Sequence, residues 1–155
     1  MRDAAVTRLN VTPGQRVGQK GLAQQLRVVA EYSDGTSRDV TASARYDSLD
    51  DGVISVAASG LVTAVGQGQA AVMVRYDEQA SVSLFMIPYA DEAKLTGWQN
   101  QNFIDEHAAA KFRELGIEPS PLCDDATYIR RAFLDAIGTL PTPEETRALL
   151  AADSP

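Results

Sequence analysis

The sequence predicts a mainly β protein: an antiparallel β-sandwich of about seven strands, followed by a small α-helical segment of two or three helices. Short runs rich in Val, Ile, Thr and Tyr fill the first half of the chain and alternate with the two-residue period of half-buried strands. Turn signals separate these runs at intervals of about 8–12 residues, a spacing typical of sandwiches. Past about Pro88 the apolar spacing becomes helical. No helical pattern lies between the strands, so a parallel sheet is not expected.

Three turn signals organise the strands. We expect the first strand to be an edge strand ended by Pro13-Gly14, a dipeptide that suits a turn. Asp34-Gly35 predicts a type I′ hairpin, which needs a positive φ at both positions. Gly66-Gln67-Gly68 predicts another hairpin turn, because it joins two strands and no helix follows as a nucleotide-binding loop would require. The expected strands cover residues 6–12, 22–32, 38–41, 44–46, 53–56, 61–65, 70–76 and 80–87.

Alternation assigns one face of each strand to the core. In the last strand we expect Val82, Leu84 and Met86 on one face and Ser83 and Phe85 on the other. The chain has one cysteine, so no disulfide can join the two sheets and aliphatic packing must do so. The expected core consists of Leu26, Val28, Ala30, Val56, Leu61, Val65, Val72, Val74, Val82 and Leu84.

Three spaced motifs in this half carry a family resemblance. Residues 32–41 read YSDGTSRDVT, residues 53–56 read VISV, and residues 59–68 read SGLVTAVGQG. In this order they resemble the bacterial immunoglobulin-like domain of group 2, over roughly residues 4–88. The resemblance implies an immunoglobulin-like sandwich. One departure is Tyr46, where the family often has Trp, and this thins the expected core locally.

The second half contains cap signals for three helices. Asn102 with Asp105 forms a capping-box-like start, and Gly116 is suited to end that helix. Its expected apolar stripe is Ile104, Ala108, Phe112 and Leu115. Asp124 caps a second helix over 125–137, before Gly138, and Thr142-Pro143 opens a third. We expect Trp98 to pack at the junction between the two halves.

The order of motifs in these helices resembles a second family. Residues 130–145 read RRAFLDAIGTLPTPEE, and with residues 102–126 they are similar to the start of a domain of unknown function from large exported planctomycete proteins linked to cytochrome-c-like domains. The resemblance implies a c-type haem domain elsewhere in a parent protein. With one histidine and one cysteine, this chain has no Cys-x-x-Cys-His motif and we expect no cofactor in it.

Charge and hydropathy exclude several classes of partner. The formal net charge is −7, with a net of −6 after residue 88, which argues against nucleic acid and anionic membrane surfaces. No window approaches the roughly 18 apolar residues of a membrane span. No apolar signal core follows Met1, and since the chain stops directly after a helix we expect an excised fragment.

The acidic loop 47–52 is the one candidate metal site. Asp47, Asp50 and Asp51 could supply hard oxygen ligands to calcium. Their spacing does not fit the alternating ligands of an EF-hand, so a solvated turn-forming loop is favoured and we assign no metal.

The remaining candidates favour structural interpretations. His107, the only histidine, has acidic neighbours that point to other faces of its helix, so we assign it no catalytic role. Cys123 precedes a helix N-terminus, but Asp124 and Asp125 oppose a lowered thiol pKa, and a semi-buried thiol is expected. Arg130 and Arg131 diverge on their helix and are expected to pair with Asp124, Asp125, Asp135 or Glu144.

These observations predict three segments and no enzyme: a sandwich at 1–88, a linker at 89–98, and a truncated helical domain at 99–155. The resemblances imply a non-enzymatic accessory or interaction module of an exported multidomain protein, at the cell surface or in the periplasm, for adhesion or domain spacing. The alternative is the N-terminal piece of a redox or catalytic domain whose active parts lie outside the chain. We expect a monomer whose partner is a surface glycan or a protein, bound through loops 34–37, 47–52 or 66–68.

Overall fold

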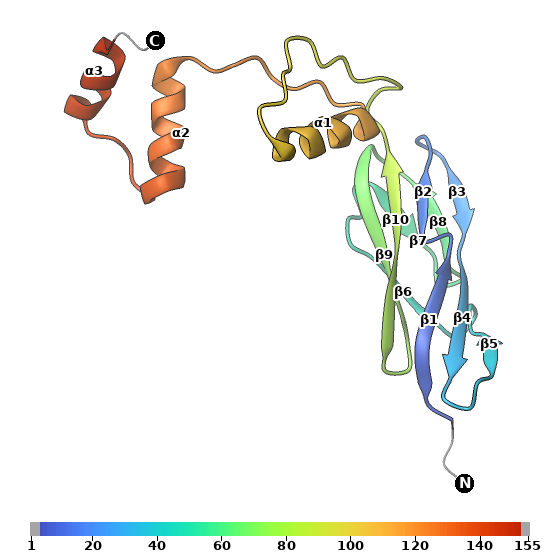
Figure 1. The fold of residues 1–155 in the computed structure, drawn as a ribbon. Coiled ribbons are helices and arrows are strands. Elements are labelled where there is room, and N and C mark those ends of the chain that lie inside the picture. Colours follow the sequence, from blue (N-terminus) through green and yellow to red (C-terminus); the bar gives the residue numbers. More distant parts are fainter. Residues whose placement is uncertain (1–3, 153–155) are drawn as a thin grey trace. The chain divides into compact units, whose positions relative to one another are not determined.

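A computed structural model describes residues 4–152 (Figure 1); the last residues, on which the expectation of an excised fragment depends, lie outside this range. The chain divides into two compact units, the first ending at Glu118 and the second beginning at Pro119. The described residues of the first unit form ten strands and one helix, α1 (Phe103–Leu115). The sequence predicted this helix in a segment with the other helices. The strands are β1 (Val6–Thr12), β2 (Gln15–Val17), β3 (Ala23–Gln25), β4 (Arg27–Tyr32), β5 (Ser37–Asp39), β6 (Arg45–Ser48), β7 (Ile54–Val56), β8 (Leu61–Ala64), β9 (Gly68–Tyr76) and β10 (Gln79–Ile87); the helices are α1 (Phe103–Leu115), α2 (Asp125–Ile137) and α3 (Pro143–Ala151).

The strands form an immunoglobulin-like sandwich, as predicted. Their orders are β1-β4-β5, β3-β8-β7 and β2-β10-β9-β6. Only Leu26 separates β3 from β4, and its N–H donates to the Gly60 carbonyl, so the two three-stranded sheets continue one another. All described pairs are antiparallel except β2 with β10. The first strand crosses between layers at Pro13-Gly14: β1 pairs with β4, and β2 pairs with β10.

The core lies between β4 and β9, whose inward faces were predicted correctly. Leu26, Val28 and Ala30 are fully buried, as are Val72 and Val74. These belong to one continuous apolar cluster. The charged residues of these strands, Arg27, Glu31 and Arg75, all lie on the opposite face. A one-residue slip would turn them into the core, so the sequence itself selects which face points inward.

Two other strands face the opposite way from the prediction. In β10, Phe85 and Ser83 are buried in the sandwich, while Val82 is 50% exposed. The Ser83 hydroxyl donates to the Pro13 carbonyl at 2.6 Å, which satisfies its buried oxygen. In β8 the buried residues are Val62 and Ala64, not Leu61 and Val65. Both strands carry apolar residues on both faces, so alternation could not choose between them.

One predicted hairpin is wrong, and a second has the predicted strand pairing, β4 with β5, but a different turn type. Gly66-Gln67-Gly68 joins β8 to β9, which belong to different sheets, so this segment crosses between layers. A Cβ on Gly66 would lie 2.0 Å from the Gly52 carbonyl oxygen, and this close approach requires glycine. At Asp34-Gly35 only Gly35 has a positive φ. The Gly35 N–H donates to the Tyr32 carbonyl, and the Tyr32 N–H donates to the Thr36 carbonyl. This is a three-residue loop with glycine in the left-handed position.

All three helices begin at their predicted caps, and α1 and α2 end before Gly116 and Gly138 as predicted. Asn102 and Thr142 form capping boxes, and Asp124 accepts from the Thr127 N–H. The buried face of α1 differs from the predicted stripe, because Ala109 is fully buried and Ile104 is 62% exposed. No helix among the described residues is long and apolar enough to cross a membrane.

The orientation of β10 can be tested by truncating one residue on each face. Phe85→Ala should lower the free energy of unfolding by about 3–5 kcal/mol, because it leaves a cavity in the core. Val82→Ala, on the exposed face, should cost less than about 1 kcal/mol. Denaturant unfolding of both variants measures the difference. A larger loss for Val82→Ala than for Phe85→Ala would mean that β10 faces the other way.

Candidate functional site

The three aspartates of loop 47–52 do not converge. Asp47 Oδ2 accepts from Arg75 at 2.5 Å and lies 3.6 Å from Arg45 Nε. Asp50 Oδ1 instead accepts from the Gly52 N–H at 2.9 Å, closing a local turn. Among residues 4–152, no group of three His, Cys, Asp or Glu side chains is arranged to hold a metal ion. Asp47 and Asp50 therefore already bind protein groups: Asp47 pairs with Arg75, and Asp50 closes a turn.

The other predicted candidates are divided between the two units. His107 is exposed on α1, with its ring edge-on to Phe103 at 6.5 Å between centroids. Cys123 is exposed, not semi-buried, because its segment precedes α2 as an extended connector. His107 and Cys123 belong to different units. Arg130 and Arg131 are both exposed, and within the described part of the chain neither forms the predicted ion pair.

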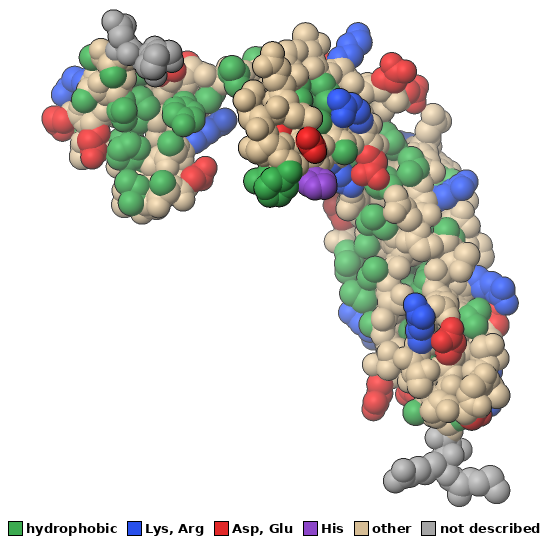
Figure 2. Space-filling view, viewed as in Figure 1, with side chains coloured by type: hydrophobic (Ala, Val, Ile, Leu, Met, Phe, Trp, Pro, Cys, Tyr) green, Lys and Arg blue, Asp and Glu red, His purple; other side chains and the backbone are tan. Residues whose placement is uncertain are grey.

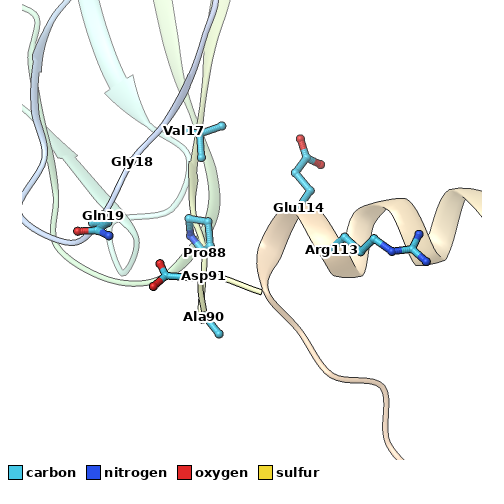
Figure 3. A pocket seen from close by; sticks show the side chains of 8 residues that line it. All are labelled: Val17, Gly18, Gln19, Pro88, Ala90, Asp91, Arg113 and Glu114. Atoms are coloured by element: carbon cyan, nitrogen blue, oxygen red, sulfur yellow. The ribbon is translucent and has the colours of Figure 1, made fainter. Parts of the chain in front are cut away.

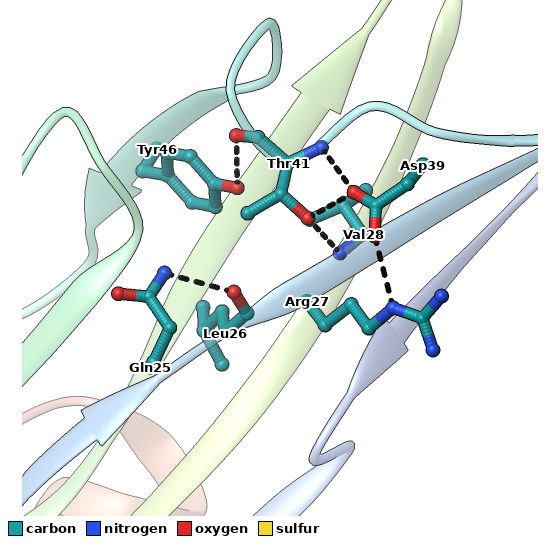
Figure 4. Close-up of polar contacts among 7 residues, drawn as sticks. All are labelled: Gln25, Leu26, Arg27, Val28, Asp39, Thr41 and Tyr46. Atoms are coloured by element: carbon teal, nitrogen blue, oxygen red, sulfur yellow. Dashed lines mark hydrogen bonds and ion pairs between the residues drawn. The ribbon is translucent and has the colours of Figure 1, made fainter.

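A polar cluster around Thr41 joins β4, β5 and β6 (Figure 4). Asp39 Oδ1 accepts from the Thr41 hydroxyl at 2.6 Å and from its N–H at 3.1 Å. The other oxygen of Asp39 accepts from Arg27 Nε at 2.9 Å. The Thr41 hydroxyl oxygen accepts from the Val28 N–H, and the Tyr46 hydroxyl donates to the Thr41 carbonyl at 2.8 Å. We call Arg27, Asp39, Thr41 and Tyr46 the Thr41 cluster.

The contacts of this cluster shift the pKa values of two of its side chains. Hydrogen bonds from Thr41 and then from Arg27 lower the pKa of Asp39 to about 2. Burial raises the pKa of Tyr46, whose ring lies against Gly60, where a Cβ would come within 2.8 Å of it. A carboxylate with such a low pKa is a weak base at neutral pH. Sequence reasoning treated Asp39 and Thr41 only as strand residues, although Asp-x-Thr is a known local turn pattern.

The remaining shifted carboxyl groups also belong to turns and helix caps. In each case threonine hydrogen bonds favour the charged form and lower the pKa. The Asp34 carboxylate accepts from the hydroxyl and N–H of Thr36, the same Asp-x-Thr geometry as at Asp39. The pairs are Asp34 with Thr36, Asp124 with Thr127, and Glu145 with Thr142.

A small cleft lies between the end of the sandwich and α1 (Figure 3). Its volume is about 220 Å³. Its charged side chains do not meet at one point: Asp91 and Arg113 extend in opposite directions, and Glu114 accepts from Lys111 at 2.7 Å. The cleft is lined by Val17, Gly18, Gln19, Pro88, Ala90, Asp91, Arg113 and Glu114. This arrangement provides neither a nucleophile with a base nor a set of metal ligands.

The second unit exposes apolar side chains. Figure 2 shows hydrophobic side chains gathered on the visible face of α2 and α3, whereas charges of both signs are interspersed over the first unit. Leu122 is fully exposed. Residues at least 48% exposed also include Tyr128, Ile137, Leu140, Leu149 and Leu150. Two helices in contact cover only part of their apolar surface.

The topology and the core define residues 5–87 as an immunoglobulin-like β-sandwich. The chain belongs to the family "Bacterial Ig-like domain (group 2)", whose model matches residues 5–84. Residues 103–155 match a second family, PSCyt2, described as "Protein of unknown function (DUF1549)". Both resemblances predicted from the sequence are therefore confirmed.

Two curated relatives align with the first half of the chain. An "S-layer-related protein" of Niallia circulans is 43% identical over 75 residues, 48% of this chain and 5% of the relative. "Ice-binding protein 1" of Shewanella frigidimarina is 32% identical over 85 residues, 55% of this chain and 10% of the relative. The chain thus spans a small part of each relative's length.

Solved structures of the S-layer protein SbsC are also similar. Domains 4 and 5 align at 15% identity and a TM-score of 0.47, covering 55% of this chain and 53% of that structure. Domains 5 and 6 align at 12% identity with the same TM-score, covering 64% of this chain and 57% of that structure.

The pKa of Asp39 predicts an acid-dependent loss of stability. Its folded value of about 2 lies below the ordinary 3.8, so ionised Asp39 favours the folded state. That contribution is complete above the unfolded pKa and disappears as the pH falls through the folded pKa. Asp39→Asn should therefore lower the denaturation midpoint at about pH 6, and the deficit should shrink toward about pH 2. Asp51→Asn, at another exposed position, controls for the loss of one surface carboxylate. A deficit for Asp39→Asn that stays constant from about pH 6 to about pH 2 would contradict the linkage.

Calcium should leave loop 47–52 unchanged. The reason is that Asp47 already pairs with Arg75, and Asp50 closes its own turn. Amide NMR signals of this loop, followed while calcium is added, should not shift. Saturable shifts that disappear in Asp50→Asn would instead establish a calcium site.

Proposed function

We propose that the first unit is a non-catalytic accessory module of an exported multidomain surface protein, which spaces or presents other domains. Membership of the bacterial Ig-like family supports this proposal and is the observation that carries it. The S-layer-related name of one relative supports a location at the cell surface. The alignments cover only 5% and 10% of the two relatives, as expected for a module embedded in larger proteins.

The chemistry of the described residues fits such a role. The carboxylates with shifted pKa values all serve turns or caps. No buried side-chain nitrogen or oxygen atom of residues 4–152 lacks a hydrogen-bond partner. Catalytic sites usually keep strained or unpaired polar groups aimed into a cavity. We therefore propose that the unit works as a stable scaffold and, isolated, as a monomer without a cofactor.

Loop 34–37 is the best placed of the three predicted loops for contact with a surface glycan or protein. It follows β4 near Val6 and Tyr76, at the end of the sandwich opposite α1. Arg38 beside this loop stacks over the Tyr32 ring, 4.9 Å from its centroid, and this contact holds an exposed cation next to the loop. Loop 66–68, by contrast, is engaged by the chain itself, since Gln67 Nε2 donates to the Tyr89 carbonyl.

Surface labelling of the producing bacterium tests the proposal. An antibody against the first unit should label intact cells, and deletion of residues 5–87 from the parent protein should spare the activity of its other domains. The purified chain should bind isolated cell envelopes. Ser37→Lys should weaken this binding, while Ser55→Lys, at another exposed strand serine, should not. A strictly intracellular protein, or one whose deleted form folds but loses all chemistry, would contradict the proposal.

A second candidate function is that α2 and α3 begin a redox or catalytic domain completed elsewhere in a parent protein. The PSCyt2 match and the exposed apolar face of this unit favour it. Hydrogen exchange in a chain extended past Pro155 should then show slower exchange in α2 and α3 than in the present chain. Identical exchange rates would remove this candidate and leave the accessory module.

A further inference from the structure

Helix α1 starts the segment that matches the second family, yet it lies in the same compact unit as the sandwich. The Ig-like match ends at residue 84, and the segment from 85 to 102 belongs to neither family. Two independent domains on a flexible tether would leave this segment and the end of the sandwich free. The contacts there are instead those of a packed junction.

Backbone groups join the helix end to the chain that follows β10. The last carbonyls of a helix lack partners within it. The Leu115 carbonyl accepts from the Tyr89 N–H at 2.8 Å, which supplies such a partner from another segment. Gly116, with φ of 63°, ends the helix against Ala90: a Cβ at this glycine would lie 2.0 Å from the Ala90 carbonyl oxygen. This separation admits glycine alone.

Side chains on both sides of the junction, in β10 and in α1, are buried. Met86 is fully buried although it points away from the sandwich core, on the face of β10 where Val82 is exposed. Lys111 Nζ of α1 lies 3.8 Å from its sulfur. On the helix, Ala109 is fully buried, and Phe112 packs edge-on against Trp98 at 5.4 Å between centroids.

The segment between β10 and α1 also contacts loop 66–68. Gln67 Nε2 donates to the carbonyls of Pro88 and Tyr89 at 3.3 Å. A Cβ on Gly68 would meet the Tyr89 hydroxyl at 3.3 Å. Residues 88–90 are thus fixed between loop 66–68 and the C-terminal end of α1.

We propose that α1 is a docked C-terminal cap of the Ig-like module, with Gly116 as the residue that permits docking. The end of the sandwich is an interaction surface whose partner is this helix. The boundary between rigid bodies then falls after Glu118, not in the segment between the two family matches, and the module holds its last residues in one position. The proposal concerns the junction alone, so it is independent of whether the module acts at a cell surface.

Two glycines of this chain provide a matched test. Gly116 and Gly138 both end helices in the left-handed conformation, but a Cβ at Gly138 meets no atom within 4 Å. Alanine imposes the same backbone strain at both positions, and only Gly116→Ala forces the helix from Ala90. In the full chain, Gly116→Ala should speed hydrogen exchange of the Tyr89 amide by about tenfold or more, and Gly138→Ala should leave it unchanged.

A second pair separates docking from helix stability. Ala109 is buried and Ala110 is exposed on the same helix, so Ala109→Glu places a carboxylate in the junction while Ala110→Glu places it in water. Only Ala109→Glu should speed exchange at Tyr89 and expose Met86 to oxidation by peroxide. If both members of each pair leave Tyr89 equally protected, or both affect it equally, α1 is not a docked cap. None of these results depends on where the parent protein is located.

Discussion

The rest of the first unit depends on how β10 is inserted. Its inward face carries Phe85 into the core and places Ser83 on the Pro13 carbonyl, where the chain crosses between layers. One edge pairs with β9, and the end of the strand pairs in parallel with β2. On its outward face, Met86 is buried at the end of the strand next to α1. Each face of β10 packs against a different part of the first unit. Only one register fits, because a slip by one residue would exchange the two faces.

Polar groups in this protein are used to close turns and cap helices. The Thr41 cluster joins three strands through hydrogen bonds, and Asp34 and Thr36 repeat its Asp-x-Thr geometry beside the β4–β5 turn. The lowered pKa of Asp39 results from these hydrogen bonds. Perturbed pKa values can mark catalytic sites, but they arise equally in structural networks. Here their location favours a scaffold, consistent with the family to which the chain belongs.

The predicted loops and the candidate cleft show where sequence reasoning reached its limit. The aspartates of loop 47–52 are close in sequence, yet Asp47 pairs with Arg75 from a distant strand, and no local pattern contains that partner. Gly66 and Gly68 suggested a hairpin because both flanking runs are strands. In the structure these glycines allow the chain to cross between layers and to pass close to Gly52 and Tyr89. The cleft beside α1 was not predicted, because the residues that line it are far apart in the sequence, from Val17 to Glu114.

The sequence alone determined the features that arise within a few residues. Helix starts at Asn102, Asp124 and Thr142 could be read directly, since a cap acts on N–H groups two or three residues away. The inward faces of β4 and β9 could be read because all of their charged residues lie on the other face. Only the tertiary structure decided the faces of β8 and β10 and the placement of α1 with the sandwich. Those strands have apolar residues on both sides, and the choice depends on the neighbours that each side meets after folding.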